Sequence, residues 1–130
     1  MNNAVTTDTM ALVLRLEQRR LPHQVRMIFA EAENEQRHVY IPAMVLAEIG
    51  YLSERGRIDL GLDDLSNYCN THQTVIEAPL NQAIINHSFG IDDIPELHDR
   101  LIAGTASYLK LPLLTNDPVI ARSQYLTVIW

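Results

Sequence analysis

The sequence contains little cysteine and little lysine. Its 130 residues include one cysteine, Cys69, which has no second thiol for an internal disulfide. A protein without disulfides suits a reducing compartment, so we expect a cytoplasmic location. Nine of the ten basic residues are arginine, and sixteen acidic residues bring the net charge to −6. Such an acidic protein is a poor general binder of nucleic acid, which argues against a DNA-binding module.

Several patterns with a defined chemical role are also missing. No apolar run approaches the length that spans a bilayer, and residues 1–10 have no basic region before an apolar core. We therefore expect neither a membrane segment nor a secretory signal. The histidines lack metal-ligand spacing, which argues against zinc. No Gly-rich loop follows the first predicted strand and no Gly-x-Ser-x-Gly occurs, so nucleotide-binding and serine-hydrolase roles are unsupported.

What the chain does contain is a regular alternation of short apolar runs and amphipathic segments. Strands are predicted at 4–7, 38–41, 73–78, 113–115 and 126–130, and helices at 9–17, 23–36, 43–54, 59–72, 80–88, 95–111 and 119–124. The pattern predicts one α/β domain over residues 1–130. Its central parallel sheet has about five strands, with helices on both faces. Alternation alone does not give the strand order.

Residues 95–118 combine a helix, a short buried strand and a sharp stop. Pro95 is predicted at the first helical position, with Glu96 and Asp99 in the first turn, and Pro112 ends the helix. Asp117 follows the buried strand directly. Two carboxylates, Asp99 and Asp117, are thus tied to a helix start and to a strand end.

Asp8 has the same relation to the first strand. Because ligands of open parallel sheets sit outside the carboxyl ends of the strands, Asp8 and Asp117 are candidates for a site there. The alternative is that both are helix N-caps, a role that Asp favours and that Pro118 at the next position supports for Asp117.

Glu48 is the one charged residue between Val39 and Ser53, in a helix with apolar neighbours one turn away on either side. A partly buried carboxylate needs a partner: an arginine, a shifted pKa or a metal ion. The alternative to a metal is a buried pair, for instance with Arg100. Asp92 and Asp93, in the predicted loop before residue 95, are interpreted as a solvated turn.

Four acids, Asp8, Glu48, Asp99 and Asp117, then form a set that suits a hard divalent cation such as Mg²⁺ or Mn²⁺. Such ions activate water for attack on phosphorus. Arg15, Arg19 and Arg20 on the first helix are candidate phosphate contacts, and the alternative is a solvated helix face. On the second helix, Glu31, Glu33 and Glu35 are predicted to face outward.

The motifs around these acids resemble PIN-domain ribonucleases, and within them the VapC-type toxins of bacterial toxin–antitoxin pairs. The matching motifs are Thr-Asp-Thr at 7–9, Ile-Pro-Ala at 41–43, Ala-Glu-Ile at 47–49, Arg-Gly-Arg-Ile at 55–58, His-Asp-Arg at 98–100, Thr-Asn-Asp at 115–117 and Val-Ile-Trp at 128–130. The resemblance implies an endoribonuclease that holds Mg²⁺ or Mn²⁺ through the four acids, with Thr115 as a helper. It also implies a homodimer and a small antitoxin that covers the site.

One departure from the family pattern lies beside the first acid. The usual Asp-Thr-Asn is here Asp8-Thr9-Met10, and Met10 offers no amide. Glu96 is either an accessory acid or only a helix-start residue.

Two other functions remain open at this point. One is a catalytically weakened PIN-like module that acts through a protein partner. The other is a phosphatase-like enzyme with Asp8 as nucleophile, which would need an Asp in place of Met10 and a lysine near the site. Lys110 is the one lysine in the chain.

Overall fold

The fold is built on a parallel sheet of five strands within residues 3–130, the part of the chain that the computed structural model describes. The strand order is β3-β2-β1-β4-β5. The strands are β1 (Val5–Thr7), β2 (Val39–Pro42), β3 (Val75–Ala78), β4 (Leu113–Leu114) and β5 (Val128–Ile129). All four neighbouring pairs run parallel, which confirms the predicted α/β architecture.

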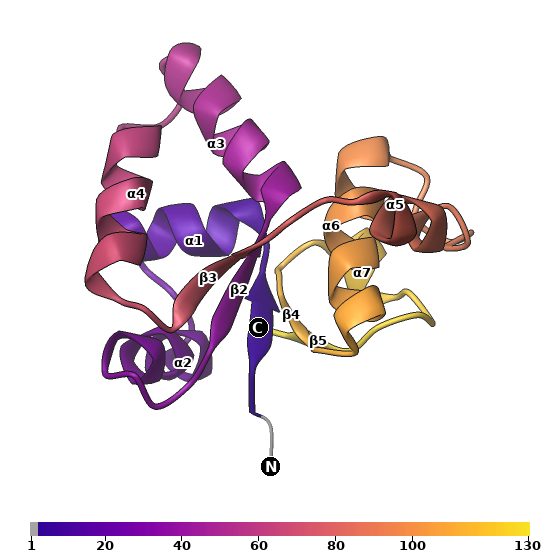
Figure 1. The fold of residues 1–130 in the computed structure, drawn as a ribbon, viewed down its shortest axis with the longest axis horizontal. Coiled ribbons are helices and arrows are strands. Elements are labelled where there is room, and N and C mark those ends of the chain that lie inside the picture. The colour runs from indigo at the N-terminus through magenta and orange to yellow at the C-terminus, as the bar shows by residue number, and fades with distance from the viewer. Residues whose placement is uncertain (1–2) are drawn as a thin grey trace.

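The helices form two layers, one on each side of the sheet (Figure 1). The first layer holds α1 (Thr9–Leu16), α2 (His23–Glu33), α3 (Ala43–Glu54) and α4 (Leu62–Thr71). The second holds α5 (Gln82–Ser88), α6 (Leu97–Leu109) and α7 (Pro118–Ala121). The chain first steps from β1 to β2 and β3, and then crosses back to β4 beyond β1. Right-handed crossovers therefore place the later helices on the opposite face.

The central strand β1 is fully buried although two of its three residues are threonine. The Thr6 hydroxyl donates to the carbonyl oxygen of Pro112 (2.7 Å), and the Thr7 hydroxyl donates to the carbonyl oxygen of Asp8 (3.0 Å). Buried hydroxyls with partners cost little, so this polar sequence tolerates a central position. Thr6 pairs with Leu113 and Thr7 with Leu114, which sets β1 beside β4.

The start of α6 differs from the prediction. The helix begins at Leu97, and Glu96 is its N-cap, accepting a hydrogen bond from the amide of Asp99 (2.8 Å). The assignment of Pro95 to the first helical position is therefore wrong. The Glu96 carboxylate, one residue after Pro95, satisfies a free amide of the first turn and fixes the helix start at Leu97.

The end of α6 also precedes its predicted stop. The helix ends at Leu109, and Lys110 adopts the left-handed conformation with φ of 58°. Its amide hydrogen-bonds to carbonyl groups of the last turn, so the chain has left the helix before Pro112.

Two other helices start later than predicted because capping groups override periodicity. The amides of Asp59 and Leu60 donate to Oε2 of Glu17 (2.8 and 3.0 Å), and α4 starts only after Gly61. The Asn81 side chain accepts from the amide of Ile84 (3.0 Å), so α5 starts at residue 82. In the described part of the chain, none of the helices combines the length and the apolar character that crossing a bilayer needs.

Candidate active site

Asp8 lies where β1 ends and α1 begins, at the point where the strand order switches. Its amide donates to the carbonyl oxygen of Leu114 at the end of β4 (3.0 Å), and its Oδ1 accepts from the amide of Ala11 (2.8 Å). The capping interpretation is thus confirmed for Asp8. The backbone bond to β4 also fixes the ends of the two neighbouring strands side by side.

Asp117 lies just after β4, at the start of α7. Its Oδ1 accepts from the amides of Val119 (2.8 Å) and Ile120 (3.1 Å), which confirms that it is also a cap. Both bonds use the same oxygen. Capping therefore leaves Oδ2 of Asp117 for another role, and the two interpretations are compatible.

Thr115 connects these two strand-end acids. Its Oγ1 accepts a hydrogen bond from the amide of Asp117 (3.1 Å), and its hydroxyl also hydrogen-bonds to Asp8. Burial raises the pKa of Asp8, and the negative charges of Asp117 and Glu48 raise it further. The hydrogen bonds from Thr115 and Ala11 lower it, but the pKa stays above the ordinary 3.8. Thr115 thus orients the Asp8 carboxyl and favours its charged form.

Glu48 projects from the middle of α3 and has a partner other than the predicted arginine. Its Oε1 accepts a hydrogen bond from the hydroxyl of Thr9, in the first turn of α1. The alternative pair with Arg100 is wrong. The Arg100 guanidinium donates to the carbonyl oxygen of Ile94 (2.8 Å) and lies over the ring of Phe89, 5.2 Å from its centroid.

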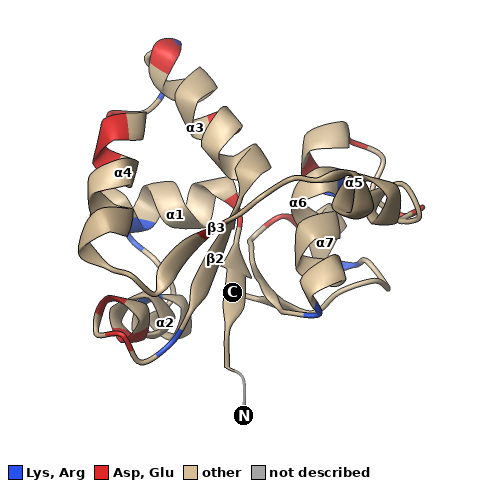
Figure 2. Ribbon diagram, viewed as in Figure 1, with Lys and Arg blue, Asp and Glu red and all other residues tan. Residues whose placement is uncertain are grey.

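Asp99, in the first turn of α6, shows most clearly that the acids converge. Burial raises its pKa to about 6, and the charges of Asp117, Glu96, Glu48 and Asp8 add to the shift. Like charges act on one another strongly only at short range, so these carboxylates share one neighbourhood. In Figure 2, acidic positions, in red, appear at the centre of the molecule, where the strands end, and in the segment beside α6 and α7.

One pocket of about 920 Å³ is lined by all four acids, Asp8, Glu48, Asp99 and Asp117; we call it the acid pocket. Each of the four is half-buried. The rest of the lining is largely apolar and includes Met10, Leu14, Met44, Tyr51, Ile102 and Trp130. The structure thus brings together the whole predicted ligand set, contributed by the ends of two strands and by two helices.

The donor chemistry of the acid pocket fits a divalent cation. Carboxylate oxygens are the ligands that Mg²⁺ and Mn²⁺ prefer, and a cation would relieve the repulsion that raises the pKa of Asp99. Within residues 3–130, however, no three Asp, Glu, His or Cys side chains are grouped closely enough to hold one ion as they stand. Shared coordination therefore requires the side chains to turn toward one another.

Three other acids that the sequence analysis considered, Glu96, Asp92 and Asp93, do not line the acid pocket. Glu96 is exposed and caps α6, and one of its carboxylate oxygens lies 2.9 Å from Nδ1 of His98. Both contacts favour the interpretation of Glu96 as a helix-start residue. Asp93 accepts from the hydroxyl of Ser123 (2.9 Å) and the amide of Gln124 (2.8 Å). Asp92 accepts from the Tyr125 hydroxyl (3.0 Å). The last two acids therefore anchor the segment before β5 and are more than a solvated turn.

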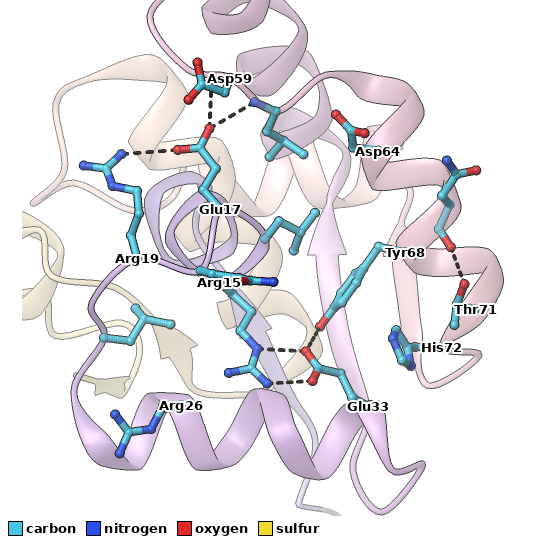
Figure 3. Close-up of a pocket in the computed structure, with 15 residues that line it drawn as sticks. Arg15, Glu17, Arg19, Arg26, Glu33, Asp59, Asp64, Tyr68, Thr71 and His72 are labelled. Carbon is cyan, nitrogen blue, oxygen red and sulfur yellow. Dashed lines mark hydrogen bonds and ion pairs between the residues drawn. The ribbon is translucent and has the colours of Figure 1, made fainter.

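The three candidate RNA-binding arginines are not in the acid pocket. Arg15 and Arg19 line a second pocket of about 960 Å³, between the end of α1, α2 and α4 (Figure 3). Arg19 lies 3.4 Å from a carboxylate oxygen of Glu17, and Arg20 is exposed. Because α1 has eight residues, its end lies about 12 Å from its start at the acid pocket.

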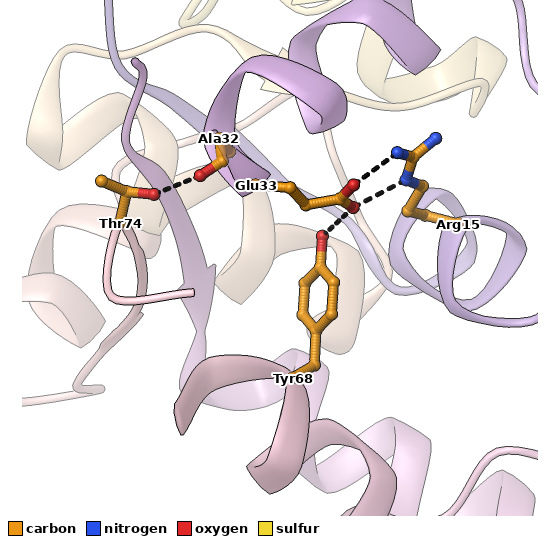
Figure 4. Close-up of polar contacts among 5 residues, drawn as sticks. All are labelled: Arg15, Ala32, Glu33, Tyr68 and Thr74. Atoms are coloured by element: carbon orange, nitrogen blue, oxygen red, sulfur yellow. Dashed lines mark hydrogen bonds and ion pairs between the residues drawn. The ribbon is translucent and has the colours of Figure 1, made fainter. Parts of the chain in front are cut away.

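Arg15 is held by a polar network that the sequence did not indicate (Figure 4). Its Nε and Nη2 donate to the two carboxylate oxygens of Glu33 (2.8 and 2.6 Å), and the Tyr68 hydroxyl donates to Oε2 of Glu33 (2.5 Å). Burial alone would raise the pKa of Glu33, but these bonds bring it below the ordinary value. The outward placement predicted for Glu33 is wrong. The three residues join α1, α2 and α4, and their separations along the chain leave no periodic signal.

Comparison with known proteins gives structural neighbours but no sequence relatives. No family model matches the chain, and no curated protein matches it. The VapBC2 complex of Rickettsia felis, bound to a DNA fragment from its promoter, has a matching chain with a TM-score of 0.74 and 17% identity. The match covers 98% of each chain.

Two more toxin–antitoxin complexes are similar. DNA-bound VapBC from Salmonella typhimurium matches with a TM-score of 0.70 and 19% identity over 99% of this chain and 98% of that one. A toxin–antitoxin complex from Klebsiella pneumoniae matches with a TM-score of 0.66 and 15% identity over 97% and 96%. At these identities the likeness concerns the fold. The five-stranded parallel sheet with flanking helices matches the PIN-like fold of VapC toxin structures.

Proposed function

We propose that this chain is a metal-dependent endoribonuclease that hydrolyses RNA phosphodiester bonds and acts as the toxin of a toxin–antitoxin pair. The main support is the convergence of Asp8, Glu48, Asp99 and Asp117 on one pocket, where burial, and after it the repulsion between the acids, raises the pKa of Asp99 to about 6. Acids with perturbed pKa values in a cleft are typical of functional sites.

In this proposal each residue has a distinct task. The four carboxylates hold Mg²⁺ or Mn²⁺, which when bound activates water and stabilises negative charge on the phosphate. Thr115 orients the Asp8 carboxyl and holds the backbone amide of Asp117, and Thr9 orients Glu48. Such supporting bonds fix the direction in which a ligand presents its oxygen.

The proposed partners follow from the structural neighbours and the resemblance. The neighbours are complexes of a toxin with its antitoxin, so we propose a cognate antitoxin for this chain as well. A homodimer, an RNA substrate and a cytoplasmic location belong to the same proposal.

The phosphatase-like alternative has little support. Met10, where that mechanism needs a second Asp, lies in the acid pocket. Lys110 caps the far end of α6 and does not line this pocket among the described residues.

A non-catalytic interaction module is the second candidate function, and one observation favours it. Met10 replaces the family's amide and is 43% exposed at the acid pocket, where the acids are not gathered into a formed metal site. Under this alternative the fold acts only through a partner surface, and Mn²⁺ binding that depends on Asp8 and Asp117 is absent.

The test is cleavage of a structured RNA with Mg²⁺ or Mn²⁺ by the parent protein, Asp8→Asn and Asp99→Asn. Asn is as good an N-cap as Asp, so Asp8→Asn removes charge while keeping the α1 cap. We expect each variant to lose about 100-fold in rate or more. Asp92→Asn, an acid outside the pocket, is the matched control and should cleave like the parent. If Asp8→Asn and Asp99→Asn cleave as well as the parent, the four-acid site is wrong.

A further inference from the structure

Much of the lining of the acid pocket is apolar or aromatic, and its most exposed aromatic residue is Tyr51. Tyr51 follows Glu48 by three residues on α3, so the two side chains share a helix face. Its side chain is 54% exposed, although it lines the same pocket as the four acids. Met10 and Trp130 lie in the same lining. A core role does not explain an aromatic ring that remains this exposed beside carboxylates.

The charges around the pocket limit how RNA can be held there. Among the described residues that line it, four are carboxylates and none is lysine or arginine. The pocket's own side chains therefore offer the RNA backbone no ion pair, so affinity beyond that of a bound cation has to come from other contacts. Arg55 does not line the pocket; its guanidinium lies over the ring of Tyr51, 5.5 Å from the ring centroid.

Stacking on an aromatic ring supplies affinity that does not depend on phosphate contacts. Every nucleobase has a π-face, and a base that leaves its helix can stack on a tyrosine. The pocket's volume of about 920 Å³ lies within the range of small-molecule sites, so a nucleotide fits inside it. The guanidinium of Arg55 restrains the ring by a cation–π contact.

We propose that Tyr51 is a positioning residue that stacks on an unpaired nucleobase next to the scissile phosphate. The stacked base has to be unpaired, because a base inside a duplex cannot reach the ring. This inference rests on the proposed nuclease function and adds a positioning residue to it.

The experiment compares the parent with Tyr51→Ala and Tyr51→Phe on a short single-stranded RNA that carries 2-aminopurine next to the cleavage site. We expect Tyr51→Ala to raise KM by about 5- to 100-fold with a smaller change in kcat, since stacking on an aromatic ring contributes on this scale. Tyr51→Phe, which keeps the ring, should behave like the parent. The parent should quench 2-aminopurine fluorescence, and Tyr51→Ala should not.

Tyr108→Ala is the matched control, because Tyr108 is 44% exposed on α6 and does not line the acid pocket among the described residues. It should leave KM and quenching unchanged. A blunt duplex of the same sequence should compete at least about 10-fold more weakly than the single strand.

The outcomes separate this inference from the function on which it rests. If cleavage requires Asp99 and Tyr51→Ala leaves KM and quenching unchanged, stacking is wrong and the nuclease function stands. If Tyr51→Ala loses Mn²⁺ affinity by the same factor as activity, the role of Tyr51 is structural and the stacking proposal is overturned. If Tyr51→Ala abolishes capture of a co-expressed antitoxin but the parent never quenches the RNA probe, the pocket holds a protein segment. If cleavage does not require Asp99, both proposals fail.

Discussion

The Thr9 hydroxyl donates a hydrogen bond to Oε1 of Glu48, and this contact joins the first turn of α1 to the middle of α3. Thr9 itself is buried, directly after the capping residue Asp8. The bond therefore fixes the direction of the one predicted ligand that comes from α3. It also gives a partly buried carboxylate the partner that it needs.

We expect Thr9→Val to weaken Mn²⁺ binding by about 10-fold, because a ligand without its supporting bond loses its orientation. Valine keeps the size and branching of threonine and removes the hydroxyl. Calorimetry with Mn²⁺ measures the change. Thr9→Ser keeps the hydroxyl and should retain the parent's affinity, whereas an unchanged affinity in Thr9→Val would show that the bond does not position Glu48.

The raised pKa of Asp99 makes the stability of the metal-free protein depend on pH. The pKa of Asp99 is about 6 in the folded chain and near 3.8 in the unfolded chain. The folded chain therefore binds the proton of the Asp99 carboxyl more tightly. The resulting stabilisation is complete below pH 3.8 and is lost as pH rises through 6. The raised pKa of Asp8 acts in the same direction.

In EDTA, the free energy of unfolding from urea titrations should fall between about pH 4 and pH 7. The part due to Asp99 is about 1–2 kcal/mol once solvent screening is allowed for. Asp99→Asn should lose that part of the fall. An equal fall in the parent and in Asp99→Asn would contradict the assigned pKa.

Tyr68→Phe tests the network that joins α1, α2 and α4. The change removes the hydroxyl that donates to Glu33 (2.5 Å) and keeps the ring. We expect a loss of about 1–2 kcal/mol in the free energy of unfolding, because a hydrogen bond to a charged group is lost. RNA cleavage should be unchanged at a temperature where both proteins are folded, since the network lies outside the acid pocket. Tyr125→Phe, whose hydroxyl bonds to the exposed Asp92, is the surface control.

Gly104 allows α6 to approach α5 closely. A Cβ at this position would lie 1.8 Å from Oγ and 2.9 Å from Cα of Ser88, so the backbone of α5 would have to move. We expect Gly104→Ala to lower the free energy of unfolding by about 2–3 kcal/mol, as overpacking does. The gain in helix propensity offsets only about 1 kcal/mol. Thermal and urea unfolding measure the loss.

Gly50→Ala is the matched helix-interior control. Its Cβ would meet only the end of the flexible, exposed Leu62 side chain, at 3.1 Å. Stability should be unchanged or slightly higher, because alanine is the better helix former. Equal losses in Gly50→Ala and Gly104→Ala would show that close packing on Ser88 is not the cause.

The sequence predicted the α/β fold because alternation of strand and helix is a local signal. It missed element ends wherever a distant or side-chain group caps the chain. The Glu17 carboxylate holds residues 59 and 60 outside α4, and Glu96 rather than Pro95 sets the start of α6. Neither effect follows from apolar periodicity.

The four acids of the candidate site were predicted because strand ends and an isolated charge mark them in the sequence. Their partners were not. Thr9 and Glu48 are separated by 39 positions, and Arg15 and Glu33 by 18, so these pairs depend on how helices pack. The metal itself and the role of the candidate RNA-binding arginines stay predictions.

The most direct test is calorimetric titration of the parent protein, Asp8→Asn, Asp99→Asn and Asp92→Asn with Mn²⁺. The account predicts that the parent binds Mn²⁺ and releases protons on binding near pH 6, because Asp99 must give up its proton. It predicts that affinity falls by about 10-fold or more in Asp8→Asn and Asp99→Asn, and is unchanged in Asp92→Asn. A parent that binds no Mn²⁺, or variants that bind it as tightly as the parent, would contradict the four-acid metal site.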